Sequence, residues 1–205
     1  MHPIIKDRVL GLEEREAQIA AAGFRVVSRY GIRRASVNDV AEEAGVSRQT
    51  VYNVFPNRSA LLAGIVRYHY ERQWEIIWQE CASASDRRER IEIAMRKLVL
   101  EPWEDLQAMP HADELELELT TSVRKEMRVI YDDVIESMSA FFEPYEKALS
   151  QHRLTPCDLA HMVQASLAGL KLSSLDRERV ESFTRSMLAC ILCVTAMPHG
   201  QADPA

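Results

Sequence analysis

Apolar residues recur along most of the chain at the spacing of one helix face. In the first such stretch, positions 19, 20, 23, 24, 27 and 30 are apolar or small, and Gly31 follows where a helix-ending glycine belongs. A long helix is predicted after Asn57, and further helices over roughly 86–107, 122–150, 155–173 and 176–197. The pattern therefore predicts an all-α protein.

Two short helices are predicted between the first helix and the long one. Ser36 and Asp39 have the spacing of a capping box, and the apolar residues that follow keep helical spacing as far as Gly45. Ser47 begins a third helix, which Pro56 ends. Two short helices joined by Gly45-Val46, the second with a polar outer face, are typical of a helix-turn-helix.

One segment departs from the helical pattern. Residues 114–119, ELELEL, alternate with a period of two, as a strand does. Glu and Leu are strong helix formers, however, and no partner strand is apparent. We expect this segment to be helical or irregular.

The polar face of the second short helix has the chemistry of a DNA reader. Arg48 suits guanine and Gln49 suits adenine, whereas Ser47, Thr50 and Tyr52 suit phosphate oxygens. The surrounding charge agrees, because residues 15–67 carry eight arginines against four acidic residues in a chain of net charge −6. Exposed charges separated by more than about 10 Å are largely screened, so a basic segment of an acidic chain still approaches phosphates.

The stretch SVNDVAEEAGVSRQTVYNVFPNRSALL, residues 36–62, resembles the DNA-binding signature of TetR-family transcriptional regulators, and IAAAGFRVVSRYG upstream resembles the family's first helix. Arg58 and Asn57 stand where the family usually has Lys and Ser, while Gln49 and Val54 depart at positions that affect the operator sequence. Arg33 and Arg34 are further candidates for phosphate contacts or belong to a solvated loop. The DNA contacts that the resemblance implies are Ser36, Val37, Ser47, Arg48, Gln49, Thr50, Tyr52, Asn53 and Arg58.

The resemblance implies an N-terminal three-helix DNA-binding domain and a larger helical domain for ligand binding and dimerisation. We predict an N-terminal arm over 1–14, the DNA-binding domain over 15–60, the helical domain over 61–197 and a tail over 198–205. No apolar run approaches the roughly 20 residues that span a bilayer, and the N-terminus lacks the apolar stretch of a signal peptide. We therefore expect a cytoplasmic protein that makes no membrane contact.

The last two helices are the predicted dimer interface. One short helix reads few bases, so such modules pair on palindromic operators. The last helix carries large apolar residues on one face and small ones on the other, which predicts burial almost all round. The small residues are Ser186, Ala189, Cys190, Cys193 and Ala196, joined by Ala165, Ala168 and Gly169 on the preceding helix. An ordinary monomer core is the alternative. We interpret Cys190 and Cys193 as small apolar fillers, because no second CxxC motif is present.

The resemblance also implies a pocket for a small-molecule effector, whose filling shifts the long helix. Core packing is the alternative role for each candidate. The acidic excess suggests a cationic apolar ligand, although a solvated acidic surface explains it more simply. The candidates are His69, Gln73, Trp74, Trp78, Trp103, Met109, Tyr131, Met138, Phe141 and Met162, with His161 as a further polar group.

We considered two alternative functions, a metal-dependent enzyme and a partner-binding module. His111, Asp113, Glu114, Glu116 and Glu118 are conceivable metal ligands, but their spacing matches no recognised metal motif. No glycine-rich phosphate loop, GxSxG or HExxH motif is present, so we expect neither an enzyme nor a bound metal or cofactor. The other alternative is a helical partner-binding module that binds no DNA.

Overall fold

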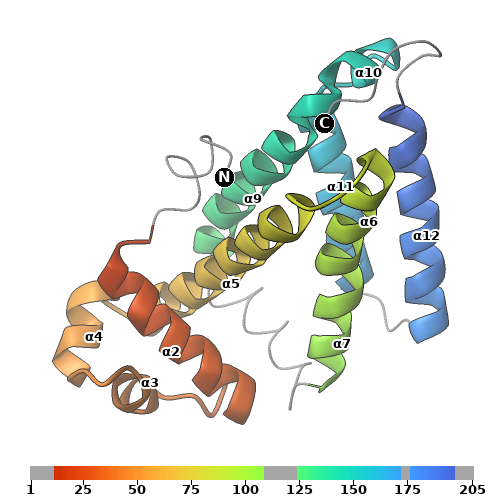
Figure 1. The fold of residues 1–205 in the computed structure, drawn as a ribbon. Helices are drawn as coiled ribbons and strands as arrows, with labels where there is room; N and C mark the ends of the chain where they lie inside the picture. The colour runs from red at the N-terminus through yellow and green to blue at the C-terminus, as the bar shows by residue number, and fades with distance from the viewer. Residues whose placement is uncertain (1–11, 109–123, 172–175, 197–205) are drawn as a thin grey trace. The chain divides into compact units, whose positions relative to one another are not determined.

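The computed structural model describes residues 12–108, 124–171 and 176–196, and all regular structure in these ranges is helical (Figure 1). This confirms the all-α prediction. The helices are α2 (Glu14–Tyr30), α3 (Val37–Ala44), α4 (Arg48–Val54), α5 (Arg58–Cys81), α6 (Arg87–Met95), the π-helical turn η1 (Arg96–Leu100), α7 (Glu101–Ala108), α9 (Arg124–Phe142), the 3-10 turn η2 (Glu143–Tyr145), α10 (Glu146–Gln151), α11 (Pro156–Lys171) and α12 (Arg177–Val194).

Side-chain caps begin the helices of the N-terminal region where the sequence predicts them. The Ser36 hydroxyl accepts from the Asp39 N–H at 3.2 Å, and the Asp39 carboxylate accepts from the Ser36 N–H at 2.9 Å. The Ser47 hydroxyl caps α4 and the Asn57 side chain caps α5. Each cap satisfies an N–H group that the helix itself leaves unpaired.

The turn between α3 and α4 depends on Gly45. Its φ of 66° lies in the left-handed region that favours glycine. The Gly45 N–H donates to the Glu42 carbonyl at 3.1 Å and the Val46 N–H donates to the Ala41 carbonyl at 2.9 Å. These bonds close α3 and direct the chain into α4.

The prediction of one helix over 122–150 is wrong. The chain leaves α-helical geometry at η2, and α10 begins only at Glu146. Pro144 lies in this turn; it lacks an N–H group, and its ring clashes with the preceding helical turn. The predicted helix over 86–107 is observed, with η1 inside it, and the segment 114–119 lies outside the described residues.

Contacts divide the chain into two compact units. The first unit contains residues 2–72 and 105–133, and the second contains residues 73–104 and 134–205. Helix α5 contributes residues to both. The proposed domain boundary after residue 60 stays a prediction.

The first unit packs α2, α3 and α4 around a small apolar core, seen at the red end of the ribbon in Figure 1. Ile19, Val40 and Val51, one from each helix, are at most 1% exposed. Gly64 of α5 provides the space for Phe55, since a Cβ at this glycine would lie 2.6 Å from Phe55 Cζ. Phe55 follows directly after α4, so this approach holds the end of α4 against α5.

The second unit has a larger core in which aromatic rings meet. Trp74 of α5 and Phe141 of α9 are 0% and 1% exposed, with ring centroids 6.1 Å apart. Trp78 packs against Phe141 at 5.7 Å, and Phe141 packs edge-on against Phe142 at 5.3 Å. Helices α6, α11 and α12 add aliphatic residues and methionines to this cluster.

A half-buried carboxylate lies in the first unit. Glu71 accepts from the Leu12 N–H at 3.2 Å, and burial raises its pKa to about 7, with smaller contributions from Glu16 and Asp133 in the same direction. The Leu12 bond and the Arg67 cation oppose this shift. Arg67 is itself paired with Asp133 at 3.0 Å.

The packing of Phe55 on Gly64 predicts a steric penalty for Gly64→Ala. We expect this variant to lose about 1–3 kcal/mol of unfolding free energy, because an aromatic ring has little freedom to move aside. Gly23→Ala is the matched control: its Cβ would approach closely only the Ile65 side chain, which is more flexible than a ring, and would lie at an ordinary contact distance of 3.7 Å from Val40 Cγ1, so the loss should be smaller. Urea unfolding of both variants measures the difference. Equal losses would contradict the role of Gly64.

The raised pKa of Glu71 predicts a pH dependence of stability. In the folded protein Glu71 keeps a proton that the unfolded chain releases above pH 4.5. The stability that depends on this proton is therefore complete below pH 4.5 and is lost as pH rises through about 7. Glu71→Gln should be more stable than the parent by about 1–2 kcal/mol at pH 8, after a discount for solvent screening, and should lose this advantage near pH 5. Urea titrations at the two pH values test this. Glu42→Gln, an exposed carboxylate of the same unit, controls for the lost charge, and a pH-independent difference would contradict the assignment.

Candidate nucleic-acid interface and effector pocket

The exposed face of α4 carries polar side chains that bond to one another. Arg48 donates to the Tyr52 hydroxyl at 3.3 Å, and its guanidinium lies 5.4 Å from the Tyr52 ring centroid. Gln49 donates to the Asn53 side-chain oxygen at 2.9 Å. These pairs are four residues apart and thus adjacent on the helix surface. They restrict side chains that would otherwise be free.

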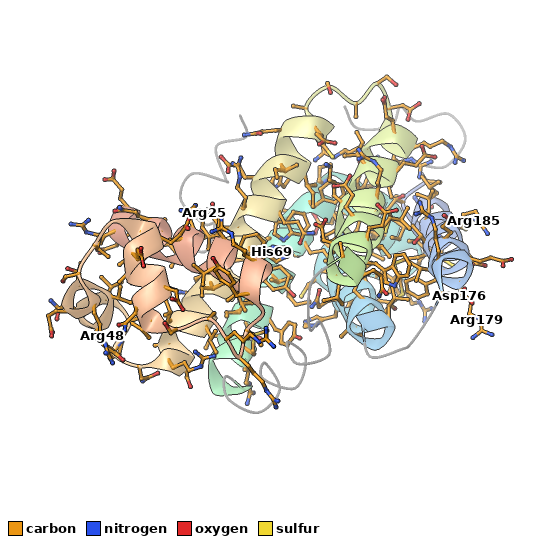
Figure 2. The ribbon with its side chains drawn as sticks, turned by 90° about the horizontal axis from the view of Figure 1, so that it is seen from below. Arg25, Arg48, His69, Asp176, Arg179 and Arg185 are labelled. Carbon is orange, nitrogen blue, oxygen red and sulfur yellow. The ribbon has the colours of Figure 1, made fainter. Side chains whose placement is uncertain are left out.

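Burial separates the two faces of α4. Val51 is 1% exposed in the core of the first unit, whereas Ser47, Arg48, Gln49 and Asn53 are exposed. Arg48 lies on this short helix at the outer side of its unit (Figure 2). Thr50, Tyr52 and Val37 are partly exposed, and Ser36 is exposed at the start of α3. The arrangement can present donors and acceptors to base edges and phosphates.

Arg58 is already engaged within the first unit. Its guanidinium donates to the carbonyl of Ile32 at 2.5 Å and to that of Ala35 at 2.8 Å. These bonds hold the loop between α2 and α3, immediately before the Ser36 cap. The sequence did not predict this role, and a phosphate contact by Arg58 stays a prediction.

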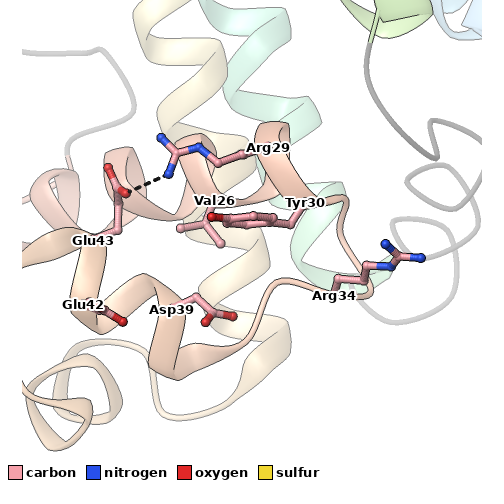
Figure 3. Close-up of a pocket in the computed structure, with 7 residues that line it drawn as sticks. All are labelled: Val26, Arg29, Tyr30, Arg34, Asp39, Glu42 and Glu43. Carbon is pink, nitrogen blue, oxygen red and sulfur yellow. Dashed lines mark ion pairs between the residues drawn. The ribbon is translucent and has the colours of Figure 1, made fainter.

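A pocket of about 550 Å³ lies between α2 and α3, and none of the predicted effector residues lines it (Figure 3). Two of its three carboxylates have local partners: hydrogen bonds from Ser36 lower the pKa of Asp39, and the Arg25 side chain lowers the pKa of Glu43. Glu43 pairs with Arg25 at 2.7 Å and with Arg29 at 3.6 Å. The lining residues are Val26, Arg29, Tyr30, Arg34, Asp39, Glu42 and Glu43. This charged lining does not suit an apolar effector.

The predicted effector residues fall into three groups. Trp74, Met138 and Phe141 are buried in the core of the second unit, with Trp78 and Trp103 partly buried against it. Gln73 also belongs to this unit and donates to the Lys97 carbonyl at 2.7 Å.

The second group lies elsewhere. His69 belongs to the first unit, where it stacks on Phe24 at 5.4 Å. Tyr131 and Met162 are 38% and 46% exposed, and His161 is also exposed. The third group is Met109 alone, which lies outside the described residues. Among the predicted effector residues in the described ranges, only the group around Trp74 therefore packs into one core.

The structure adds one residue to this group that sequence reasoning missed. The Arg90 guanidinium lies 5.3 Å from the ring centroid of Trp78 and 5.0 Å from that of Phe141. In the sequence, Arg90 is one of three arginines in the run DRRER, which is typical of a solvated helix start. The apolar neighbours Ile91 and Ala94, which are buried, are the sequence feature that could have indicated that Arg90 lies near the core.

Helix α12 has one buried and one exposed face in the single chain. Val180, Met187 and Ile191 are buried, but Ser186, Ala189, Cys190 and Cys193 are exposed. Burial of the exposed face by a second copy stays a prediction. Ala165 and Gly169 of α11 are exposed as well.

Other candidate chemistry finds no support in the described ranges. No group of His, Cys, Asp and Glu side chains there could hold a metal ion. The conceivable ligand set from His111 to Glu118 lies outside those ranges. No helix in the described part of the chain is long and apolar enough to cross a membrane.

Comparison with known proteins matches the N-terminal region to a family. Residues 19–65 match the model of the bacterial regulatory proteins of the tetR family. The chain is 30% identical over 96 residues to the HTH-type transcriptional regulator TtgR of Pseudomonas putida, a match that covers 46% of this chain and 43% of that protein. The chain thus matches less than half the length of this relative.

Solved structures share the fold over most of the chain. A TetR-family transcriptional regulator from Rhodococcus sp. is 21% identical with a TM-score of 0.65, covering 90% of this chain and 100% of that one. The regulator FadR from Bacillus subtilis, solved in complex with stearoyl-CoA, is 14% identical with a TM-score of 0.55, covering 88% of this chain and 98% of that one. Residues 19–65 thus match the tetR family of bacterial regulatory proteins, and most of the chain shares its fold with a solved TetR-family structure.

Proposed function

We propose that this protein is a cytoplasmic transcriptional regulator that binds palindromic operator DNA as a homodimer and is released from it by a small apolar molecule. The observation that carries the proposal is the exposed polar face of α4, held by the Ser47 cap and the left-handed turn at Gly45. A short helix that buries Val51 and exposes Arg48, Gln49 and Asn53 has the form of a DNA reader. Repression is the family's usual mode of action.

The exposed faces of α11 and α12 support dimerisation. Both helices bury large apolar residues in the second unit and leave small residues exposed, which lets two helix backbones approach closely. Met162 lies on the same face of α11 as Ala165 and Gly169 at helical spacing and is 46% exposed. An exposed methionine among small residues suits contact with a second copy better than a ligand pocket.

Helix α5 supports a route from effector to DNA. It is one continuous helix that carries Arg58 near its start and Trp74 and Trp78 near its end. An effector that prefers one position of α5 would shift the population toward that position and change DNA affinity.

The two alternative functions make different predictions. A partner-binding module would shift no fragment of genomic DNA in an electrophoretic assay, and a metal-dependent enzyme would retain metal after purification. The proposed function predicts a shifted DNA fragment.

Gln49 should read one base pair in each half-site. We expect that selection from random duplexes returns a palindrome for the parent protein, and that Gln49→Ala relaxes one position per half-site with a loss of about 1–3 kcal/mol in binding. Gln107→Ala, an exposed glutamine on α7, is the control and should return the parent's site. Selection of an identical site by Gln49→Ala would exclude direct readout by this residue. A site without two-fold symmetry would argue against the dimer.

Arg58 should contribute both to folding and to phosphate binding. We expect Arg58→Ala to weaken binding to operator and random DNA alike and to lower the slope of log affinity against log salt by about one. Arg58→Lys keeps the charge but not the fork that spans two carbonyls, so it should keep the slope while sharing the loss of stability. An unchanged slope in Arg58→Ala would remove the phosphate contact and leave the carbonyl contacts as the role of Arg58.

A further inference from the structure

Arg90 of α6 is a half-buried cation with no acidic partner among the described residues. Its neighbours on the same stretch of chain are paired: Arg88 with Glu92 at 3.3 Å, and Arg96 with Glu80 at 2.9 Å. The Arg90 guanidinium instead lies against the rings of Trp78 and Phe141, and its Nε is buried without a hydrogen-bond partner. A buried donor without an acceptor costs free energy, and the cost is larger for a charged group.

The nearest thiol does not neutralise this cation. Cys81 donates through Sγ to the Arg90 carbonyl at 3.4 Å, and burial raises the pKa of the thiol to about 11. The thiol is therefore protonated at neutral pH and carries no negative charge. Among the described residues, no negative charge pairs with Arg90 at the edge of this apolar cluster.

A second unpaired donor belongs to the same cluster. Trp74 is 0% exposed, and its indole N–H has no hydrogen-bond partner in the described structure. A buried tryptophan usually finds an acceptor for this group. Trp74 and Arg90 both pack against Phe141, at 6.1 Å and 5.0 Å, so two unsatisfied donors flank one ring.

The cluster reaches the protein surface on one side and contains side chains that can change conformation. Arg90 and Trp78 are partly exposed and form the outer edge of the cluster. Met95, Met138 and Met187 contribute flexible side chains to it, and methionines repack readily around a new neighbour. The adjacent turn η1 is π-helical and contributes Leu98 and Val99, and such turns are frequent at functional sites.

We propose that this cluster binds the carboxylate end of an apolar ligand, with Arg90 and the Trp74 indole N–H as the groups that recognise it. The ligand's apolar part packs among Trp78, Phe141 and Met138. This inference rests on the proposed function, since it names the effector class, and it replaces the cationic ligand suggested by the overall acidic charge. The charge of Arg90 determines which ligand charge is favoured at this site, because exposed carboxylates farther away are screened by solvent and salt.

Two matched probe pairs test the proposal by calorimetric titration of the full-length protein. They are 1-naphthoate against 1-naphthamide and decanoate against decanamide, so that each pair differs only in its end group, an anionic carboxylate against a neutral amide of similar size. We expect the carboxylate of at least one pair to bind about tenfold tighter than its amide, as a hydrogen bond to a charged group implies. Equal affinities within both pairs, or no binding of either carboxylate at millimolar concentration, would overturn the proposal.

Variants assign the preference to its residues. Arg90→Met should abolish the carboxylate preference, whereas Arg88→Met, which removes an exposed arginine of the same helix, should keep it. Trp74→Phe keeps an aromatic ring, although a smaller one, and removes the indole N–H, and it should weaken carboxylate binding about fivefold. If circular dichroism shows Arg90→Met to be unfolded, Arg90→Lys takes its place and should reduce the preference without abolishing it. A full preference in the folded Arg90 variant would overturn the assignment.

DNA binding is measured separately, without any probe. A protein that shifts operator DNA but shows no carboxylate preference overturns this inference and leaves the proposed function standing. A protein that binds the carboxylate through Arg90 but shifts no DNA supports the site and contradicts the proposed function.

Discussion

The unpaired N–H groups at the start of each helix are the constraint on which this all-helical chain depends. A helix leaves its first four N–H groups without internal partners, and these groups need acceptors. In six of the described helices the acceptor is a short polar side chain, namely Ser36, Ser47, Asn57, Asp86, Thr155 and Asp176. Because each cap also ends the preceding loop, these residues set where helices begin and how short the connections are.

The caps matter most in the first unit, where α3 and α4 are short. Helix α4 spans Arg48–Val54, less than two and a half turns by the geometry of an α-helix, so its own hydrogen bonds stabilise it weakly. The Ser47 cap, the turn at Gly45 and the packing of Val51 and Phe55 compensate for this. The polar face of α4 is therefore presented by a rigid support, although the helix would be marginal alone.

The second unit shows the opposite balance. Its core is large and aromatic, yet it retains unpaired N–H groups on Trp74 and Arg90. A core selected only for stability would pair these donors or replace them, since apolar side chains of similar volume carry no such penalty. The first unit also contains a buried N–H without an acceptor, the Nε of Arg67, but that guanidinium pairs with Asp133 at 3.0 Å, whereas Arg90 has no acidic partner among the described residues. This contrast is what suggests ligand binding in the second unit.

The sequence alone determined the helix-turn-helix. Its caps, its glycine turn and the alternation of Val51 with exposed polar residues depend on neighbours within a few positions, so a local pattern suffices to predict them. The break at η2 has a local cause too, because Pro144 cannot donate a backbone hydrogen bond, although the apolar pattern over 122–150 predicted one helix. Only the tertiary structure decided the core of the second unit, because its members come from α5, α6 and α9 and meet through long-range packing. The same reason applies to two arginines. Arg58 donates to carbonyls of Ile32 and Ala35, which lie more than twenty residues away in the sequence. Arg90 has no acidic partner in the described structure, and this too depends on which distant residues pack around it.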